Sequence, residues 1–271
     1  MTAIEHGVPL AKLTTIGVGG PARALARPRS VGELREALVF ARDEGLGVLV
    51  VGLGSNLLAG DGGVDALVLR LEGELAAVEV VEGGLLAGGG ATNAVCLHRA
   101  RDTGLGGLEF ACAIPGTAGG GVVMNAGAYG RDWSDVLARA LVVTADGEQW
   151  MTADQLGLAY RHSALGAGEV VARVEYRLER RPPADIRAMV AELIAQRKAT
   201  QPTNKRTFGS VFKNPAGEVG AGRMLELCGL KSHRQAGLLL AVEHRRAREE
   251  FGVVLEREVV FAGLPELPAL T

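Results

Sequence analysis

Ser210, Arg161 and Glu258 are the side chains of this 271-residue sequence whose types and settings could do chemistry. Ser210 lies in RTFGSVFKNP (206–215), where no neighbouring residue supplies a base, so it is a poor nucleophile. A serine hydroxyl can instead donate a proton when its surroundings stabilise the alkoxide that results. The alternative interpretation is a structural hydroxyl in a turn.

Arg161 and Glu258 are charged residues in otherwise different settings. Arg161 lies in YRHS (160–163), and its guanidinium could hold a carboxylate through two parallel hydrogen bonds. A plain surface arginine is the alternative. Glu258 lies in LEREVV, where strand alternation puts it on the same face as Glu256, so one of the two can simply be solvated.

Two glycine-rich stretches indicate a nucleotide site. GLGSNLL (52–58) follows an apolar run, and PGTAGGGVVMNAGAYG (115–130) is longer and almost free of bulky side chains. Such loops offer backbone N–H groups to phosphates, and two of them favour a dinucleotide or a large nucleotide. Neither matches GxGxxG or GxxxxGK[ST], which excludes the Rossmann and P-loop patterns. The alternative is a plain turn and an Ω-loop with structural glycines.

Composition excludes several classes of protein. A formal charge of −2 argues against nucleic acid as a partner, because such proteins usually carry a basic excess. The three cysteines are scattered and the five histidines have no metal-ligand spacing, so we expect no metal and a reduced, cytoplasmic chain. The N-terminus has no signal-peptide pattern, and no apolar run is long enough for a bilayer.

The pattern of helices and strands predicts an α+β or α/β protein in two or three lobes. Ser30 with Glu33, and Thr152 with Gln155, form capping boxes. The apolar run 47–52 predicts a strand covered on both faces, whereas 168–181 alternates like a half-exposed strand. A hairpin is expected about Asp146 and Gly147. The other expected helices cover 91–104, 184–200, 221–230 and 238–252, and the other strands 66–71, 74–82 and 253–263.

Seven stretches, taken together and in this order, resemble the UDP-N-acetylenolpyruvoylglucosamine reductase family of bacterial peptidoglycan synthesis. GSVFKNP (209–215) is highly specific together with the loop 115–130, which lies in the matching stretch GLEFACAIPGTAGGGVVMNAGAYG (107–130), and YRHS carries Arg161. The remaining stretches are TTIGVGGPA (14–22), VVGLGSNLL (50–58), AGRMLELCGLK (221–231) and LEREVVF (255–261). These stretches span almost the whole chain. The form of GGGVVMNAGAYG (119–130) is similar to the shorter, type II branch of the family.

The resemblance implies an FAD-binding fold of the vanillyl-alcohol-oxidase type. Two α+β lobes, 1–71 and 72–182, would hold FAD, and a smaller α+β lobe, 183–271, would cover the substrate. The boundary between 182 and 183 agrees with the sequence RPP (181–183), because adjacent prolines usually interrupt regular structure.

The resemblance also implies an activity. NADPH would reduce FAD, and the enolpyruvyl sugar nucleotide would then be reduced to UDP-N-acetylmuramate. In this assignment Ser210 is the proton donor to C2, Arg161 stabilises the enolate-like intermediate through the substrate carboxylate, and Glu258 assists at the same place. The expected partners are small molecules only, and the expected state is a monomer.

The binding residues implied by the resemblance fall into two sets. For FAD they are Thr15, Gly17, Val51, Gly52, Leu53, Gly54, Ser55, Asn56, Leu57, Pro115, Gly116, Thr117, Gly119, Gly120, Asn125, Ala126 and Gly127. For substrate or nucleotide they are Tyr129, Lys213, Asn214 and Arg197.

Two departures from the family pattern stand out. A segment with a His-Ala-Asn-Phe core, expected after Gly237, is absent, so AG runs directly into LLLAV. Val260 stands where the family usually has an arginine. The alternatives are therefore a regulatory FAD- or nucleotide-binding protein without activity, and an FAD oxidoreductase acting on another sugar or alcohol. Neither glycine-rich loop holds a histidine for covalent flavin attachment, although Cys112 is close.

Overall fold

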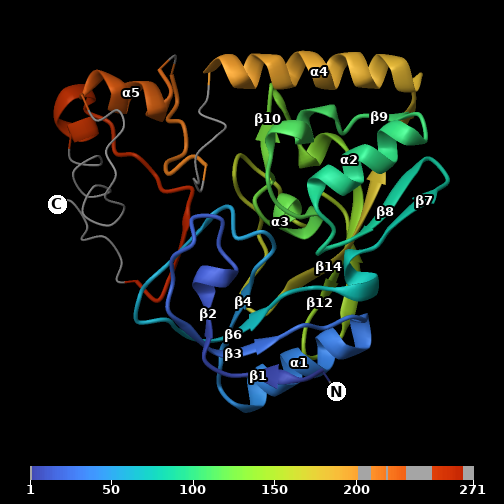
Figure 1. Ribbon diagram of the computed structural model, residues 1–271, viewed down its shortest axis with the longest axis vertical. Helices are drawn as coiled ribbons and strands as arrows, with labels where there is room; N and C mark the ends of the chain where they lie inside the picture. Colours follow the sequence, from blue (N-terminus) through green and yellow to red (C-terminus); the bar gives the residue numbers. More distant parts are fainter. Residues whose placement is uncertain (1, 201–208, 218, 230–245, 265–271) are drawn as a thin grey trace.

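The first sheet is built from residues near the N-terminus. The computed structural model describes residues 2–200, 209–217, 219–229 and 246–264 (Figure 1). The sheet has the order β1-β3-β6-β4, and β2 pairs with β3. β3 and β4 run parallel to β6, whereas β1 and β2 run antiparallel to β3. The strands are β1 (Ile4–Glu5), β2 (Val8–Pro9), β3 (Pro21–Ala26), β4 (Gly47–Val50) and β6 (Val64–Leu69).

Helix α1 (Val31–Asp43) connects β3 to β4, as the sequence predicts. The side chain of Ser30 accepts a hydrogen bond from the Glu33 N–H and so caps the first turn. The expectation that the strand at 47–52 is covered on both faces is wrong. β4 lies at the edge of the sheet, and Val50 remains 43% exposed, because nothing in the described chain pairs with its outer side.

The second sheet is antiparallel, with the order β13-β12-β14-β8-β7. Its strands are β7 (Val78–Val81), β8 (Gly84–Gly88), β12 (Leu137–Val143), β13 (Glu148–Met151) and β14 (Val170–Arg177). β14 lies in the middle and is mostly buried, which corrects the half-exposed strand expected there. The hairpin of β12 and β13 turns at Asp146 and Gly147, as predicted. The capping-box hydrogen bonds of Thr152 and Gln155 also form, within a turn.

Helices α2 (Asn93–Asp102) and α3 (Ala118–Val123) pack on the second sheet, and Trp133 and Tyr176 lie fully buried among them. A separate apolar cluster joins the two sheets. It takes Leu34 from α1, Leu67 from β6 and Val143 from β12, all fully buried. Burying each such side chain stabilises the fold by about 1.5–3 kcal/mol. The two sheets therefore form one continuous body, and the α+β class is confirmed.

The remaining part crosses the top and left of Figure 1. Helix α4 (Pro183–Thr200) begins at the predicted boundary and packs on the 3₁₀ helix Glu109–Ala113. Helix α5 (Ala221–Leu227) shares a buried cluster with Leu58, Phe212 and Leu255. Two short pairs complete the fold: β9 (Leu105–Gly106) with β15 (Glu179–Arg180), and β10 (Gly127–Ala128) with β11 (Arg131–Asp132).

The chain returns to the first part at its end. The expected final strand is reduced to β16 (Val260–Ala262), which pairs parallel with β5 (Leu57–Ala59). Of the helix expected at 238–252, residues 246–251 are helical, and 238–245 lie outside the described residues. The division into three lobes at 72 and 183 stays a prediction. β16 belongs to the third lobe by sequence but pairs with the first.

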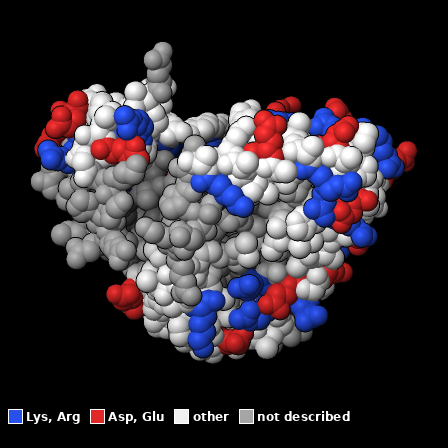
Figure 2. Space-filling model, turned by 45° about the horizontal axis from the view of Figure 1, so that its top comes forward, with Lys and Arg blue, Asp and Glu red and all other residues white. Residues whose placement is uncertain are grey.

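The surface and the arrangement of the side chains give three further facts. Figure 2 shows basic and acidic side chains interspersed over the face that carries α4 and α5. None of the helices within the described ranges is long and apolar enough to cross a membrane. Among these residues, no three His, Cys, Asp or Glu side chains converge as metal ligands would.

Candidate active site

Arg161 sits at the tip of a tight turn. Backbone hydrogen bonds of 3.1 Å run in both directions between Ala159 and His162, which leaves Tyr160 and Arg161 at the tip. Arg161 has φ +52°, a left-handed conformation that L-residues rarely adopt. Within the described chain, the other non-glycine residues with positive φ are Asn125 and Tyr129. Such strain persists only where surrounding contacts enforce it, and it gathers at functional sites.

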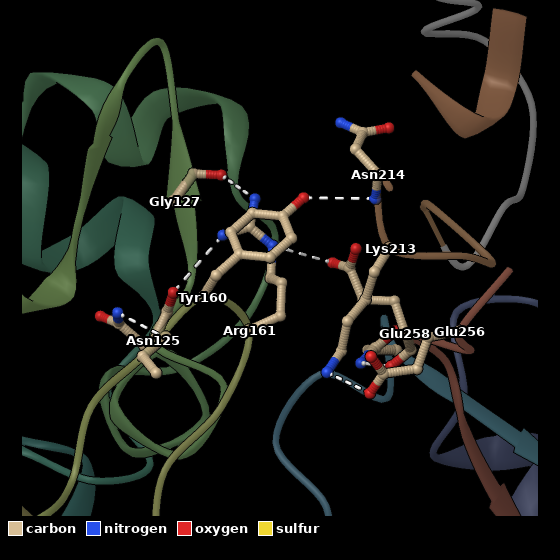
Figure 3. A network of polar contacts seen from close by, with 10 residues as sticks. Asn125, Gly127, Tyr160, Arg161, Lys213, Asn214, Glu256 and Glu258 are labelled. Carbon is tan, nitrogen blue, oxygen red and sulfur yellow. Dashed lines mark hydrogen bonds and ion pairs between the residues drawn. The ribbon is translucent and has the colours of Figure 1, made fainter. Parts of the chain in front are cut away.

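The guanidinium of Arg161 is held by three acceptors (Figure 3). Nη2 donates to the Gly127 carbonyl at 2.7 Å and Nη1 to the Asn125 carbonyl at 3.4 Å. Nε donates to Glu258 Oε1 at 3.2 Å. Since a guanidinium has five N–H groups, one on each terminal nitrogen is not engaged by the described residues. A Cβ on Gly127 would lie 2.5 Å from Arg131 O and 3.2 Å from Arg161 Nη1, so glycine lets both β11 and the arginine approach.

Glu258 is the anionic partner of Arg161, and its surroundings shift its pKa in opposite directions. Burial raises the pKa of the Glu258 carboxyl, while the nearby Arg161 charge and hydrogen bond, and the Lys213 charge, lower it. The burial effect is the largest, so the pKa lies above its ordinary value. The carboxyl is therefore easier to protonate than an exposed glutamate.

Ser210 stands at the end of a segment that runs beside Glu258. Val211 O accepts the Glu258 N–H at 2.8 Å, and Glu256 O accepts the Lys213 N–H at 2.8 Å. This short antiparallel pairing places Ser210 one residue from the Glu258 backbone contact. Ser210 itself is exposed. The structure thus brings the segments of all three predicted catalytic residues together, although their roles stay predictions.

Lys213 and Asn214 follow Ser210 and have partners of their own. Lys213 Nζ forms an ion pair with Glu256 Oε1 at 2.5 Å. Asn214 Oδ1 accepts the Ala221 N–H at 3.0 Å, at the start of α5, so its side chain orders the fold locally. Its amide nitrogen remains for the substrate contact that the resemblance implies.

The loop 51–57 reaches the same place from the first sheet. Asn56 Nδ2 donates to the Glu258 carbonyl at 3.0 Å, and Val260 N donates to Asn56 O at 3.0 Å. Ser55 Oγ donates to Pro115 O at 2.7 Å. The backbone N–H groups of residues 52–56 take no part in the hydrogen bonds of the described residues. Free N–H groups in a glycine-rich loop are the usual cradle for a phosphate.

The second glycine-rich loop faces the first. A Cβ on Gly52 would lie 2.7 Å from Thr117 Oγ1. The backbone of the first loop therefore lies directly against the Thr117 side chain of the second. Thr117 caps α3 by accepting the Gly120 N–H at 3.4 Å. Gly119 packs against carbonyls of the second sheet, and Ala126 N donates to Gly121 O at 2.9 Å.

Thr15 and Gly17 lie in the N-terminal segment, and Thr15 contacts the loop 51–57. Thr15 N and Oγ1 both lie near the Gly54 carbonyl, at 3.2 and 3.3 Å. Gly54 has φ +64°, and a Cβ there would meet Leu13 O at 2.1 Å, so only glycine fits. The N-terminal segment therefore supports the loop 51–57, and flavin binding by these residues stays a prediction.

Tyr129 and Arg197 lie toward α4 instead. The Tyr129 hydroxyl donates to the Leu193 carbonyl of α4 at 2.8 Å, and Arg197 is close enough to lower the pKa of Tyr129, although burial raises it overall. They border the site on its α4 side.

Two residues of the site were missed by sequence reasoning. Tyr160 contacts both Arg161 and Asn214, and its place beside Arg161 was the available signal. Asn93 is 2% exposed, and its N and Nδ2 donate to Gly116 O and Ile114 O. Its buried Oδ1 accepts no hydrogen bond within the described residues. No sequence motif marks Asn93, because its role depends on the loop that folds over it.

Comparisons with known proteins agree with this arrangement. Residues 22–153 match the family model described as FAD binding domain. The chain is 40% identical to UDP-N-acetylenolpyruvoylglucosamine reductase 2 of Symbiobacterium thermophilum, over 95% of this chain and 84% of that protein. It is similar to the crystal structure of the reductase (MurB) from Thermus caldophilus, with TM-score 0.81 and 32% identity over 97% of this chain and 100% of that one.

A further relative bears on the predicted missing segment. The chain is 39% identical to UDP-N-acetylenolpyruvoylglucosamine reductase of Anaeromyxobacter dehalogenans, over 96% of this chain and 86% of that protein. That alignment runs over 284 residues, more than the 271 of this chain, so the relative contains residues that this chain lacks. The predicted position, after Gly237, lies outside the described residues.

Proposed function

This chain belongs to the UDP-N-acetylenolpyruvoylglucosamine reductase family, and from that premise we propose that it reduces UDP-N-acetylglucosamine enolpyruvate to UDP-N-acetylmuramate, with FAD as cofactor and NADPH as reductant. The observation that carries the proposal is the Arg161–Glu258 pair. It lies between the segment of Ser210 and the glycine-rich loop, to which Asn56 ties Glu258.

The residues present fit a bound FAD. The N–H groups of residues 52–56, which no other described residue engages, suit its diphosphate, and Gly52 lets this loop approach Thr117 of the second glycine-rich loop closely. The unpartnered Asn93 Oδ1 is a buried acceptor beside the second loop, where a hydroxyl or N–H of a ligand would satisfy it. Bound FAD supplies the hydride that reaches C3 of the enolpyruvyl group.

Arg161 binds the substrate carboxylate in this proposal. Addition of hydride at C3 breaks the carbon–carbon double bond and leaves negative charge on C2 and the conjugated carboxylate. The two guanidinium N–H groups not engaged by the described residues can bind that carboxylate, and the fixed positive charge stabilises the transition state. Glu258 holds the guanidinium in place through Nε.

Ser210 completes the reaction by donating its hydroxyl proton to C2. C3 has then gained a hydride and C2 a proton, which balances the reduction. The serine alkoxide left behind needs nearby positive charge before it is reprotonated from solvent, and Lys213, on the same segment, is the cation proposed to provide it.

An anaerobic experiment tests this function. The flavin is reduced with NADPH, NADP⁺ is removed, and UDP-N-acetylglucosamine enolpyruvate is added while the flavin absorbance is followed. Reoxidation without oxygen is the expected result. A flavin that stays reduced would contradict the proposal and favour either the regulatory protein or an oxidoreductase with another substrate.

The proposal also covers location and assembly. The protein works in the cytoplasm, where NADPH and nucleotide sugars are available, and as a monomer, because all residues proposed for the reaction come from one chain. Sedimentation equilibrium should give a mass near 28.2 kDa. A dimer mass would contradict the monomer while leaving the proposed reaction intact.

A further inference from the structure

We propose that Tyr160 is a positioning residue that fastens the Arg161 turn to the segment carrying Ser210. The inference rests on the proposed function, because it concerns the alignment of the carboxylate-binding group with the proton donor. It assigns a role to Tyr160, a residue of the YRHS stretch for which the sequence predicted none.

The turn that presents Tyr160 is fixed on its own side. Asn125 Nδ2 donates to the Ala159 carbonyl at 3.0 Å, and Ser163 Oγ donates to the Val123 carbonyl at 2.8 Å. These contacts flank the tip on both sides. The two tip residues, Tyr160 and Arg161, are therefore presented together from a rigid base.

Tyr160 makes two contacts at this tip, both visible in Figure 3. Its ring lies under the Arg161 guanidinium, with Cζ 5.0 Å from the ring centroid, a cation–π distance. Its hydroxyl oxygen accepts the Asn214 backbone N–H at 3.3 Å. One side chain thus touches the group that binds the substrate carboxylate and the segment that carries the proton donor.

The other side of the Ser210 segment is held by the Glu258 segment. Glu258 N donates to Val211 O at 2.8 Å and Lys213 N to Glu256 O at 2.8 Å. Asn214 Oδ1 also holds the segment to α5 by accepting the Ala221 N–H at 3.0 Å, and Tyr160 ties the same segment to the Arg161 turn. Tyr160 closes a ring of contacts: Tyr160 to Asn214, along the chain to Val211, to Glu258, and back to Arg161.

The contacts are modest, which sets the expected effect. Tyr160 is 51% exposed, so water can replace the hydroxyl as a partner of Asn214. A neutral hydrogen bond contributes about 0.5–1.5 kcal/mol, which corresponds to about a 2- to 12-fold change in rate. Loss of the ring as well removes the support under Arg161.

The experiment compares Tyr160→Phe and Tyr160→Leu with the wild-type holoenzyme in both half-reactions. Flavin reduction by NADPH should stay within about a factor of two in either variant. Flavin reoxidation by the enolpyruvyl substrate should slow about 2- to 12-fold in Tyr160→Phe and further in Tyr160→Leu. Trp150→Leu is the matched control. Trp150 lies on β13 of the second sheet, and Cζ of Arg139 lies 4.5 Å from its ring centroid, a comparable cation–π contact.

Two further measurements separate positioning from a general loss of structure. Amide hydrogen exchange at Asn214 should accelerate in Tyr160→Phe, whether or not the substrate is the proposed one. The pH profile of reoxidation should shift to higher pH only in Tyr160→Leu, because a less well-fixed Arg161 lowers the Glu258 pKa less.

Wild-type behaviour separates this inference from the proposed function. If the wild-type flavin is not reoxidised by the substrate, the proposed function is wrong and the inferred role falls with it. If the wild type is reoxidised, but Tyr160→Phe matches it and Asn214 exchange is unchanged, the inferred role alone is wrong. Equal slowing of both half-reactions in the variants would also overturn it.

Discussion

Arg161 and Glu258 lie 97 positions apart in the sequence, yet their side chains meet, with 3.2 Å between Nε and Oε1. Each side chain is 18% exposed. Charges in this position are screened less by salt than exposed pairs are. The contact links the turn 159–162 to the segment before β16. It therefore stabilises the site and joins distant parts of the chain.

Removing the Arg161 charge should therefore destabilise the protein, because Glu258 is left largely desolvated without its partner. Arg161→Gln should lower the free energy of unfolding by about 1–3 kcal/mol. Glu258→Gln should lower it less, because burial raises the Glu258 pKa and so already disfavours its charge. The double variant should lose less than the sum of the singles, by about 0.5–3 kcal/mol. Urea unfolding of the four proteins measures this coupling.

The exposed pair of Arg42 and Asp146 is the control for this cycle. Its side chains are 53% and 89% exposed, so Arg42→Gln and Asp146→Asn should show almost no coupling. Additive effects at Arg161 and Glu258 as well would mean that their contact contributes nothing measurable.

The raised pKa of Glu258 predicts a pH dependence of stability. In the unfolded chain the carboxyl titrates at its ordinary value of 4.5, and in the folded protein it titrates higher. Between these values the folded state binds more protons, so the free energy of unfolding falls as pH rises through the folded pKa. Glu258→Gln should remove that fall, whereas Glu148→Gln, at an exposed position, should keep it. Urea titrations from pH 4 upward at constant salt, about 0.1 M, decide this.

Local elements of the fold could be predicted because local physics determines them. The Ser30 cap, the hairpin at Asp146 and the helix after Pro182 all formed as expected. The exposure of the strands could not be predicted, because it depends on the order of the strands in each sheet. β4 was expected inside and is an edge strand, while β14 was expected to be half-exposed and lies in the middle.

The candidate site likewise has a part that the sequence predicts and a part that it does not. Residue type and motif indicated Arg161, Glu258 and Ser210, and the glycine-rich loops indicated a nucleotide. Their pairing depends on β16 lying parallel to β5, a contact between segments far apart in the sequence that no local pattern encodes. The contact of Tyr160 with Asn214 and the buried Oδ1 of Asn93 depend on that same tertiary arrangement, so neither could be predicted.

Ser210→Ala should separate the two half-reactions. Flavin reduction by NADPH should be unchanged, because no proton from Ser210 is needed there. Reoxidation by the enolpyruvyl substrate should slow by about 10²–10⁴-fold, the usual contribution of a general acid. Stopped-flow measurement of flavin absorbance follows both steps. Thr103→Ala, which removes a hydroxyl bonded to Arg99 O on α2, should leave both rates unchanged. Equal slowing of both steps in Ser210→Ala would contradict its role as proton donor.

Gly52→Ala should weaken FAD binding. The added Cβ would lie 2.7 Å from both Oγ1 and Cγ2 of Thr117, so the two glycine-rich loops must move apart. Such overpacking costs about 1–3 kcal/mol, which predicts about a 5- to 150-fold weaker affinity where the displaced loops are those that hold the cofactor. Titrating apoprotein with FAD and following flavin fluorescence gives the dissociation constant. Gly62→Ala is the matched control, since a Cβ there meets nothing within 4 Å. Unchanged FAD affinity in Gly52→Ala would show that the loop 51–57 does not hold the flavin.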